Sequence, residues 1–224
     1  MNYLEANINY LKEAKSEVLK GFPDSVFQKG VSGLTIDNVQ LIADRLAIPL
    51  ENLLLYPLFA PKEKLKKIKL LILDVDGVLT DAGMFFSESG DQMKKYNAKD
   101  GMAIMALRKK GFDIGIISSG FKTEMVKSRA DLLRINLFYV GREPKIDILD
   151  AWLKDLGYSY SEVAIIGDDI NDLPLMREVG LSVCPQDAVD LVKKQADIVL
   201  SRKGGDACVR EFIDNFLLST PVSN

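Results

Sequence analysis

The sequence predicts an α/β protein in which a parallel sheet is covered by helices on both faces, with a small all-α domain in front of it. Two observations carry this prediction. From about residue 68, short runs that are apolar on both faces alternate with stretches of helical length, which is typical of buried parallel strands between helix layers. The first sixty residues instead repeat apolar side chains at helical spacing. With 224 residues, of which 47% are apolar, the chain is long enough to bury the core that this arrangement needs.

Residues 1–60 are expected to form several short helices, because Gly and Pro clusters interrupt the helical spacing near residues 21–23, 30–33 and 48–49. We place the domain boundary near Pro61 and interpret the lysine-rich segment 61–67 as a linker. Residues 68–224 would then form the α/β domain.

Within that domain the alternating pattern predicts a Rossmann-like sheet and a projecting β-hairpin. The expected strands are 69–73, 113–117, 137–140, 163–166, 181–183 and 198–200. The expected helices are 102–110, 122–133, 145–156, 173–179 and 207–218. The hairpin is expected at 84–96, with its turn at 87–91.

Composition excludes several classes of function. The chain has no histidine, so a Ser-His-Asp triad, a Cys-His dyad and His-ligated zinc or haem are excluded. Lys and Arg total 29 against 32 Asp and Glu, which leaves no overall positive field to hold nucleic acid. No apolar run reaches the ~20 residues of a membrane span, and the N-terminus lacks a signal-peptide pattern. We therefore expect a cytoplasmic protein with no membrane partner and with reduced cysteines.

Two acidic clusters follow predicted strands at the point where each strand ends. Asp74 and Asp76 follow the first strand, and Asp168, Asp169 and Asp172 follow the fourth. A solvated turn or a helix N-cap explains one of these residues but not all of them. Like charges beside buried strands are costly unless a cation compensates, and an oxygen-only ligand set indicates a hard ion such as Mg²⁺.

Two further positions are weaker signals by themselves. Ser118, Ser119 and Gly120 follow the second strand, where such a sequence is commonly just a loop. Lys145 begins a predicted helix, and a lone lysine is commonly solvated. A lysine beside a Mg²⁺ site would nevertheless help to neutralise a bound phosphate.

The segments LLILDVDGVLTD, IIS, a downstream lysine and IIGDDINDLPLM, in that order, resemble the haloacid dehalogenase-like phosphohydrolase superfamily. Within it, the chain resembles the capless sugar-acid phosphatases of 3-deoxy-D-manno-octulosonate 8-phosphate (KDO 8-phosphate) and nonulosonate 9-phosphates. The hairpin, the segment Ala98–Met102 and the short spacing that leaves no room for a cap domain support this subgroup. The resemblance spans about residues 68–218 and implies a Mg²⁺-dependent phosphomonoesterase that acts through an aspartyl-phosphate.

The resemblance also assigns roles to the acidic residues. Asp74 would be the nucleophile, and Asp76 the general acid/base. The Asp74 carboxylate, the Asp76 backbone carbonyl and Asp168 would hold Mg²⁺. Asp169 or Asp172 would orient water around the ion.

The remaining implied roles concern the phosphate and the sugar. Ser118 would bind phosphoryl oxygens, and Lys145 would balance the charge of nucleophile and phosphate. Ser119 and Gly120 would lie against the substrate. Relatives often carry an Arg or Glu in this loop to help choose the substrate, whereas this chain continues with Phe121.

The implied partners are a small sugar phosphate and further copies of the chain. In the subgroup the hairpin, here residues 84–96, joins subunits into a tetramer, and exposed Phe85, Phe86 and Tyr96 would give it an apolar surface. The segment with Gly204, Gly205 and Arg210 resembles one that reaches a neighbour's active site, although Gly204-Gly205 is also a simple turn before a helix. Lys122 and Arg142 are candidate replacements for the missing loop charge.

Residues 1–60 partly resemble a phage-repressor-type helix-turn-helix domain, through the segments 7–12 and 34–54. The intervening segment 16–33 is short and broken by Gly and Pro. Residues 1–60 carry five basic side chains against seven acidic ones, a balance poorly suited to binding DNA. We favour a packing or protein-interaction module.

Several hypotheses remain open from the sequence. The leading one is the sugar-acid phosphatase. The alternatives are a DNA-binding or protein-interacting regulator whose phosphatase-like domain senses a sugar phosphate, an inactive scaffold, and a phosphatase for another small phosphate. The intact set Asp74, Asp76, Lys145 and Asp168 argues against the scaffold.

Overall fold

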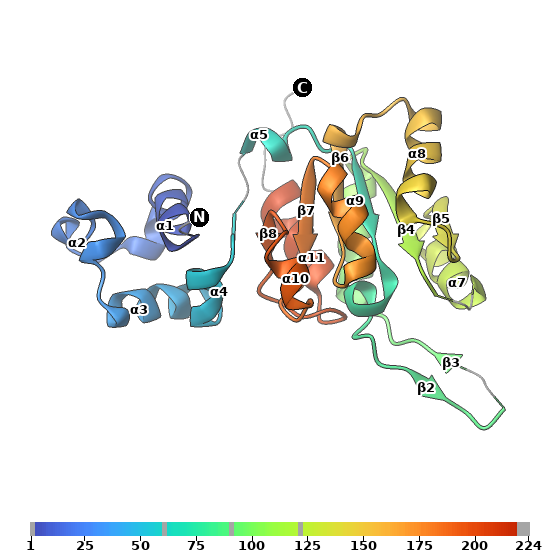
Figure 1. The fold of residues 1–224 in the computed structure, drawn as a ribbon, viewed down its shortest axis with the longest axis horizontal. Helices are drawn as coiled ribbons and strands as arrows, with labels where there is room; N and C mark the ends of the chain where they lie inside the picture. Colours follow the sequence, from blue (N-terminus) through green and yellow to red (C-terminus); the bar gives the residue numbers. More distant parts are fainter. Residues whose placement is uncertain (1–2, 60–61, 90–91, 121–122, 219–224) are drawn as a thin grey trace.

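The computed structural model describes residues 3–59, 62–89, 92–120 and 123–218. Its centre is a six-stranded sheet in which every pair of neighbouring strands is parallel, in the order β5-β4-β1-β6-β7-β8 (Figure 1). The strands are β1 Leu70–Leu73, β4 Asp113–Ser118, β5 Leu137–Val140, β6 Val163–Ile166, β7 Leu181–Cys184 and β8 Ile198–Val199. The parallel α/β sheet predicted from the sequence is confirmed, and each strand lies within one residue of its expected bounds.

Helices cover both faces of this sheet because successive strand residues point to opposite sides. Leu71 and Leu73 pack on one face with α6 Ala98–Lys109, α7 Thr123–Leu133 and α11 Cys208–Phe212. Leu70 and Ile72 pack on the other face with α8 Lys145–Leu156, α9 Leu173–Glu178 and α10 Asp190–Lys193. The buried β1 strand is therefore apolar at every position, as the sequence pattern indicates.

Two helix boundaries differ from the expectation. The helix expected from residue 102 begins at Ala98, because the Asn97 side chain accepts a hydrogen bond from Lys99 N and caps the helix. The helix expected at 207–218 comprises α11 and then a π-type segment, Ile213–Leu217. The short 3₁₀ helices Tyr160–Glu162 and Ile170–Asp172, together with α10, were not anticipated.

The hairpin leaves the sheet after β1 and projects away from it (Figure 1). Strand β2, Phe85–Phe86, pairs antiparallel with β3, Gln92–Met93. Phe85 and Phe86 are exposed, as expected, but the expectation for Tyr96 is wrong: this ring is half-buried against the core, with the Arg129 guanidinium 5.2 Å from its centre. Part of the expected turn, residues 90–91, lies outside the described residues.

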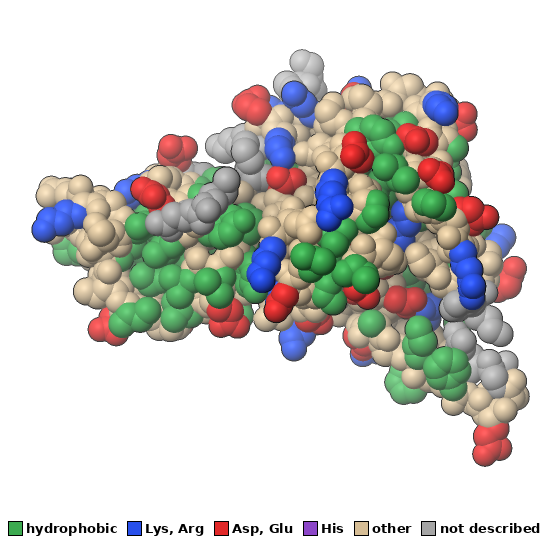
Figure 2. Space-filling model, viewed as in Figure 1, with side chains coloured by type: hydrophobic (Ala, Val, Ile, Leu, Met, Phe, Trp, Pro, Cys, Tyr) green, Lys and Arg blue, Asp and Glu red, His purple; other side chains and the backbone are tan. Residues whose placement is uncertain are grey.

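The N-terminal residues have a hydrophobic core of their own, visible as the part at the left of Figures 1 and 2. Its helices are α1 Tyr3–Ala14, Ser16–Leu19, α2 Asp24–Gln28, Gly30–Gly33, α3 Ile36–Leu46 and α4 Leu50–Leu55. The Thr35 hydroxyl accepts a hydrogen bond from Asn38 N and so caps α3. Side chains that include Ile8, Leu11 and Ile42 fill this core.

The segment expected to be a linker is docked on the sheet where the structure describes it. Helix α5, Lys62–Leu65, buries Leu65 in the core, and Lys64 pairs with Asp197 at 2.7 Å. Pro57, which precedes helix α5 in the chain, accepts a hydrogen bond through its carbonyl oxygen from Val199 N of strand β8 at 2.8 Å. Pro61, our expected boundary, lies outside the described residues. No helix in the described part of the chain is long and apolar enough to cross a membrane.

Candidate functional site

Asp74 lies at the carboxyl end of the central strand β1, where the backbone leaves the sheet. Its side chain is buried, and its N–H donates to Ile166 O of the neighbouring strand β6 at 3.1 Å. The following turn needs Gly77, which has a φ of +86° and at which a Cβ would collide with the Asp168 carboxylate. The glycine therefore allows the two acidic segments to approach each other.

The two acidic segments converge because β1 and β6 are neighbours, with Leu73 opposite Ile166. Carboxylate oxygens of Asp74, Asp168 and Asp172 lie within 4.8 Å of one another. Lys145, the first residue of α8, places its buried ammonium 2.8 Å from Asp74 Oδ1 and 2.6 Å from Asp172 Oδ1. Residues from three separate motifs of the sequence thus form one cluster.

The charges in this cluster perturb one another. Burial raises the pKa of Asp74 to about 6, against the attraction of Lys145. Burial, and then repulsion from Asp74 and Asp172, raises the pKa of Asp168 to about 8. Burial lowers the pKa of Lys145, but its two carboxylate partners outweigh this effect, so that the net shift is upward and the ammonium stays charged.

The cluster fits a divalent cation. Asp168 Oδ1 is buried and has no hydrogen-bond partner among the described residues, and the available ligands are all oxygen atoms. Asp172 is already engaged, because Oδ1 accepts from Lys145 and Oδ2 accepts from Asp168 N at 3.0 Å. The Asp169 carboxylate caps Ile170 N at 2.7 Å. Asp74 and Asp168 are therefore the carboxylates with oxygen atoms to offer an ion.

Two polar side chains lie close to Asp76 Oδ1. The Thr80 hydroxyl lies 3.3 Å from Asp76 Oδ1, and the Lys94 ammonium forms an ion pair with the same oxygen. Lys94 is not among the site residues predicted from the sequence. The signal available there was a lysine near the base of the hairpin, but neighbouring Lys95 is an equally plausible candidate from sequence, and only the structure distinguishes the two.

A pocket of about 450 Å³ opens over these groups. Ser118, at the end of β4, is buried and accepts a hydrogen bond from Gly120 N at 3.2 Å. The Ser119 hydroxyl accepts from Asn171 Nδ2 at 3.1 Å. The lining comprises Asp74, Asp76, Ala82, Met84, Phe86, Lys94, Ser118, Ser119, Gly120, Val126, Asp168, Asp169 and Asn171. Anionic, cationic and hydroxyl groups thus share one cavity, a combination suited to phosphoryl transfer.

The chain is similar to proteins of a known family. Residues 144–212 match the family described as haloacid dehalogenase-like hydrolase. The chain is 38% identical over 156 residues to the 3-deoxy-D-manno-octulosonate 8-phosphate phosphatase of Escherichia coli K12, covering 70% of this chain and 82% of that protein. This chain belongs to the haloacid dehalogenase-like hydrolases. It falls in the branch of the KDO 8-phosphate phosphatases and is a phosphoric monoester hydrolase.

Solved structures of that branch agree. The 3-deoxy-D-manno-octulosonate 8-phosphate phosphatase from Yersinia pestis superposes with a TM-score of 0.69 and 35% identity, covering 72% of this chain and 86% of that one. The enzyme from Moraxella catarrhalis, solved with a magnesium ion, a phosphate ion and KDO, has a TM-score of 0.68 and 31% identity, covering 71% and 91%.

Gly204, Gly205 and Arg210, which are expected near a neighbour's active site, are not among the described residues that line the Asp74 pocket of their own chain. Gly204 and Gly205 pack against the backbone of the Asp76–Asp81 loop, where a Cβ on either glycine would meet backbone atoms. Arg210 pairs with Asp214 at 2.9 Å and lines a second cavity with Lys99. Their proposed substrate contacts stay predictions. Arg142 does not line the Asp74 pocket within the described residues, and Phe121 and Lys122 lie outside those residues.

Proposed function

We propose that this hydrolase is a Mg²⁺-dependent phosphomonoesterase that cleaves a sugar-acid phosphate of the KDO 8-phosphate or nonulosonate 9-phosphate type through an aspartyl-phosphate on Asp74. The observation that carries the proposal is the convergence of Asp74, Asp168 and Lys145 beneath one pocket. The substrate class rests on the names of the relatives, which act on KDO 8-phosphate.

In the first step, a carboxylate oxygen of Asp74 attacks phosphorus, and the bond from phosphorus to the sugar oxygen breaks. Lys145 reduces the repulsion between the Asp74 carboxylate and the incoming phosphate, since its ammonium already contacts Asp74. Ser118 offers a buried hydroxyl to the phosphoryl oxygens. Asp74, the Asp76 carbonyl and Asp168 would hold Mg²⁺, which would further neutralise the charge of the phosphate.

Asp76 carries the proton in both steps. It donates a proton to the departing sugar oxygen and then removes one from the water that attacks the phosphorylated Asp74. Inorganic phosphate leaves, and the Asp74 carboxylate is restored. This division of roles agrees with the positions of the two groups, because Asp74 is buried with Lys145 whereas Asp76 is partly exposed in the pocket.

Turnover of a panel of phosphorylated octulosonates, nonulosonates and hexoses, with and without Mg²⁺, tests the proposal. We expect Mg²⁺-dependent release of phosphate, fastest from a sugar-acid phosphate, and at least a ~10³-fold loss in Asp74→Asn because the nucleophile is gone. Full Mg²⁺-dependent turnover by Asp74→Asn would exclude Asp74 as the nucleophile. Faster turnover of hexose phosphates would favour the alternative, a phosphatase for another small phosphate, which the uncharged loop Ser118–Gly120 allows.

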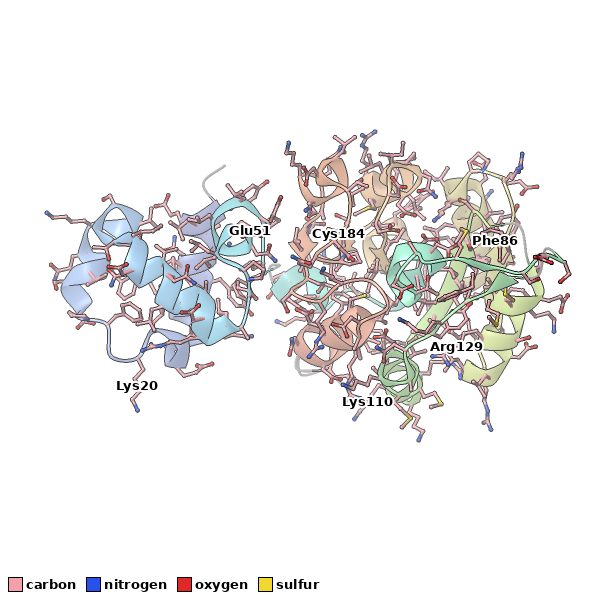
Figure 3. All side chains as sticks on the ribbon, turned by 90° about the horizontal axis from the view of Figure 1, so that it is seen from below. Lys20, Glu51, Phe86, Lys110, Arg129 and Cys184 are labelled. Atoms are coloured by element: carbon pink, nitrogen blue, oxygen red, sulfur yellow. The ribbon has the colours of Figure 1, made fainter. Side chains whose placement is uncertain are left out.

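We further propose that the hairpin joins copies of the chain into a homotetramer. Met84, Phe85, Phe86 and Met93 are all exposed on this one projecting element, and such a set of apolar side chains is costly to leave in water (Figures 2 and 3). Sedimentation of the full chain tests this: a tetramer that dissociates in Phe85→Ser/Phe86→Ser supports it, and a wild-type monomer contradicts it.

Residues 1–60 are proposed to be a separate helical domain for protein interaction, on the basis of their own core. The charge of this segment argues against nucleic acid. A gel shift of duplex DNA at moderate salt separates the two alternatives, because specific retardation would favour the DNA-binding regulator. Cytoplasmic location stays a prediction.

A further inference from the structure

We propose that Lys94, at the base of the hairpin, is a positioning residue that holds the Asp76 carboxylate by Oδ1 and leaves Oδ2 for proton transfer to the substrate. This inference rests on the proposed function, in which Asp76 carries the proton. It connects the hairpin, which the chemistry has so far left unused, to the reaction.

The geometry around Asp76 gives Lys94 this task. The Thr80 hydroxyl lies 3.3 Å from Asp76 Oδ1 and 3.2 Å from Val75 O. A hydroxyl has one proton, so Thr80 cannot donate to both acceptors at once. Among the described residues, Lys94 is therefore the donor that holds Asp76 Oδ1 without sharing its proton with Val75 O. No described residue donates to Asp76 Oδ2.

Burial separates Lys94 from an ordinary surface lysine. Its side chain is 8% exposed and lines the pocket together with Met84 and Phe86 of the same hairpin. The next residue, Lys95, is 69% exposed and pairs with Asp81 at 2.7 Å on the surface. Exposed pairs contribute little to stability, whereas an ammonium withdrawn from water stays charged only with a partner such as Asp76. Lys95 is thus a matched control.

The charge of the site supports the same assignment. Five carboxylates, those of Asp74, Asp76, Asp168, Asp169 and Asp172, face the two ammonium groups of Lys145 and Lys94. Lys145 is engaged with Asp74 and Asp172. Lys94 is then the cation that faces Asp76, so the base of the hairpin adds a positive charge to the pocket lining.

The test compares kcat/KM for two leaving groups, because kcat/KM reports only the steps up to cleavage of the ester. p-Nitrophenolate leaves without a proton, whereas a sugar alkoxide needs one from Asp76. In Lys94→Met we expect kcat/KM to fall about 10–100-fold for the sugar phosphate that the wild type cleaves fastest, and less than about 3-fold for p-nitrophenyl phosphate. Lys94→Arg should recover part of the loss, and Lys95→Met should behave as wild type.

Equal losses for the two esters in Lys94→Met would overturn the inference, because Lys94 would then act on the phosphate itself. Wild-type kinetics in Lys94→Met would overturn it as well. Thermal unfolding of each variant checks that it is folded. If Lys94→Met is unfolded, the leaving-group dependence of kcat/KM is measured in Lys94→Arg instead. Equal kcat/KM losses for the two esters in Lys94→Arg would then count against the inference. Absence of Mg²⁺-dependent turnover in the wild type would instead refute the proposed function.

Discussion

Replacing Asp168 by Asn should make the metal-free protein more stable while it removes the response to Mg²⁺. The Asp168 carboxylate lies within 4.8 Å of those of Asp74 and Asp172. Two unit charges at that distance repel by about 3–4 kcal/mol at an effective dielectric constant of ~20. Asp168 faces two such neighbours, and Lys145 offsets part of the repulsion. We therefore expect a gain of about 2 kcal/mol, or a rise in Tm of roughly 4–8 °C for a chain of this size.

The effect should depend on pH in one direction. Because the pKa of Asp168 is raised to about 8, the native state binds this proton more tightly than the unfolded chain does. The cost of the carboxylate therefore grows as the pH rises towards 8 and is constant above it. The gain in the variant should accordingly be larger at about pH 8.5 than at about pH 5.

Thermal unfolding in EDTA, followed by circular dichroism, measures this gain, and millimolar Mg²⁺ should raise the Tm of the wild type but not of the variant. Asp131→Asn is the control, because this exposed carboxylate pairs with Lys127 on helix α7 and does not line the Asp74 pocket. A metal-free Asp168→Asn protein less stable than wild type at pH 8.5 would refute the reasoning, because Asp168 would then be held by favourable contacts.

Four further outcomes are expected. Lys145→Met should lose at least ~10³-fold in kcat and about 3–5 kcal/mol of stability, because buried Asp74 and Asp172 lose their common cation; a stable, active variant contradicts this. Ser118→Ala should lower kcat/KM about 10–100-fold with its Tm nearly unchanged, and an unchanged kcat/KM would remove Ser118 from the site. Burial raises the pKa of Asp100 to about 6, so the stability of the wild type relative to Asp100→Asn should decrease as the pH rises from about 4 to 6. An increase over that range would contradict the raised pKa of Asp100. Burial also raises the pKa of both thiols, so Ellman's reagent should not modify the native protein, and rapid labelling of two thiols would contradict the buried core.

The sequence specified the sheet well because β1 and β6 are buried on both faces, which requires continuous apolar runs such as Leu70–Leu73. It also located Asp74, Asp168 and Lys145, since residues that follow parallel strands gather at one edge of the sheet. The ends of the helices are predicted less accurately than the strands. The start of α6 depends on the Asn97 cap, one side-chain hydrogen bond that no apolar period reveals.

Long-range pairings were beyond the sequence for a different reason. Lys94 and Lys95 are adjacent and chemically identical, so their spacing alone cannot show which one faces Asp76. Tyr96 was assigned to the exposed hairpin because it lies beside β3, yet it packs against Arg129 of α7. Both outcomes depend on how the hairpin leaves the sheet, which tertiary packing determines.

A crystal structure of the full chain with Mg²⁺ and beryllium fluoride, a mimic of the phosphoryl group, tests the central claim most directly. We predict one metal ion bound by both Asp74 and Asp168, and the fluoride group attached to an Asp74 oxygen within reach of Lys145 and Ser118. An ion bound away from this pair of carboxylates, or a fluoride group on another residue, would contradict the account.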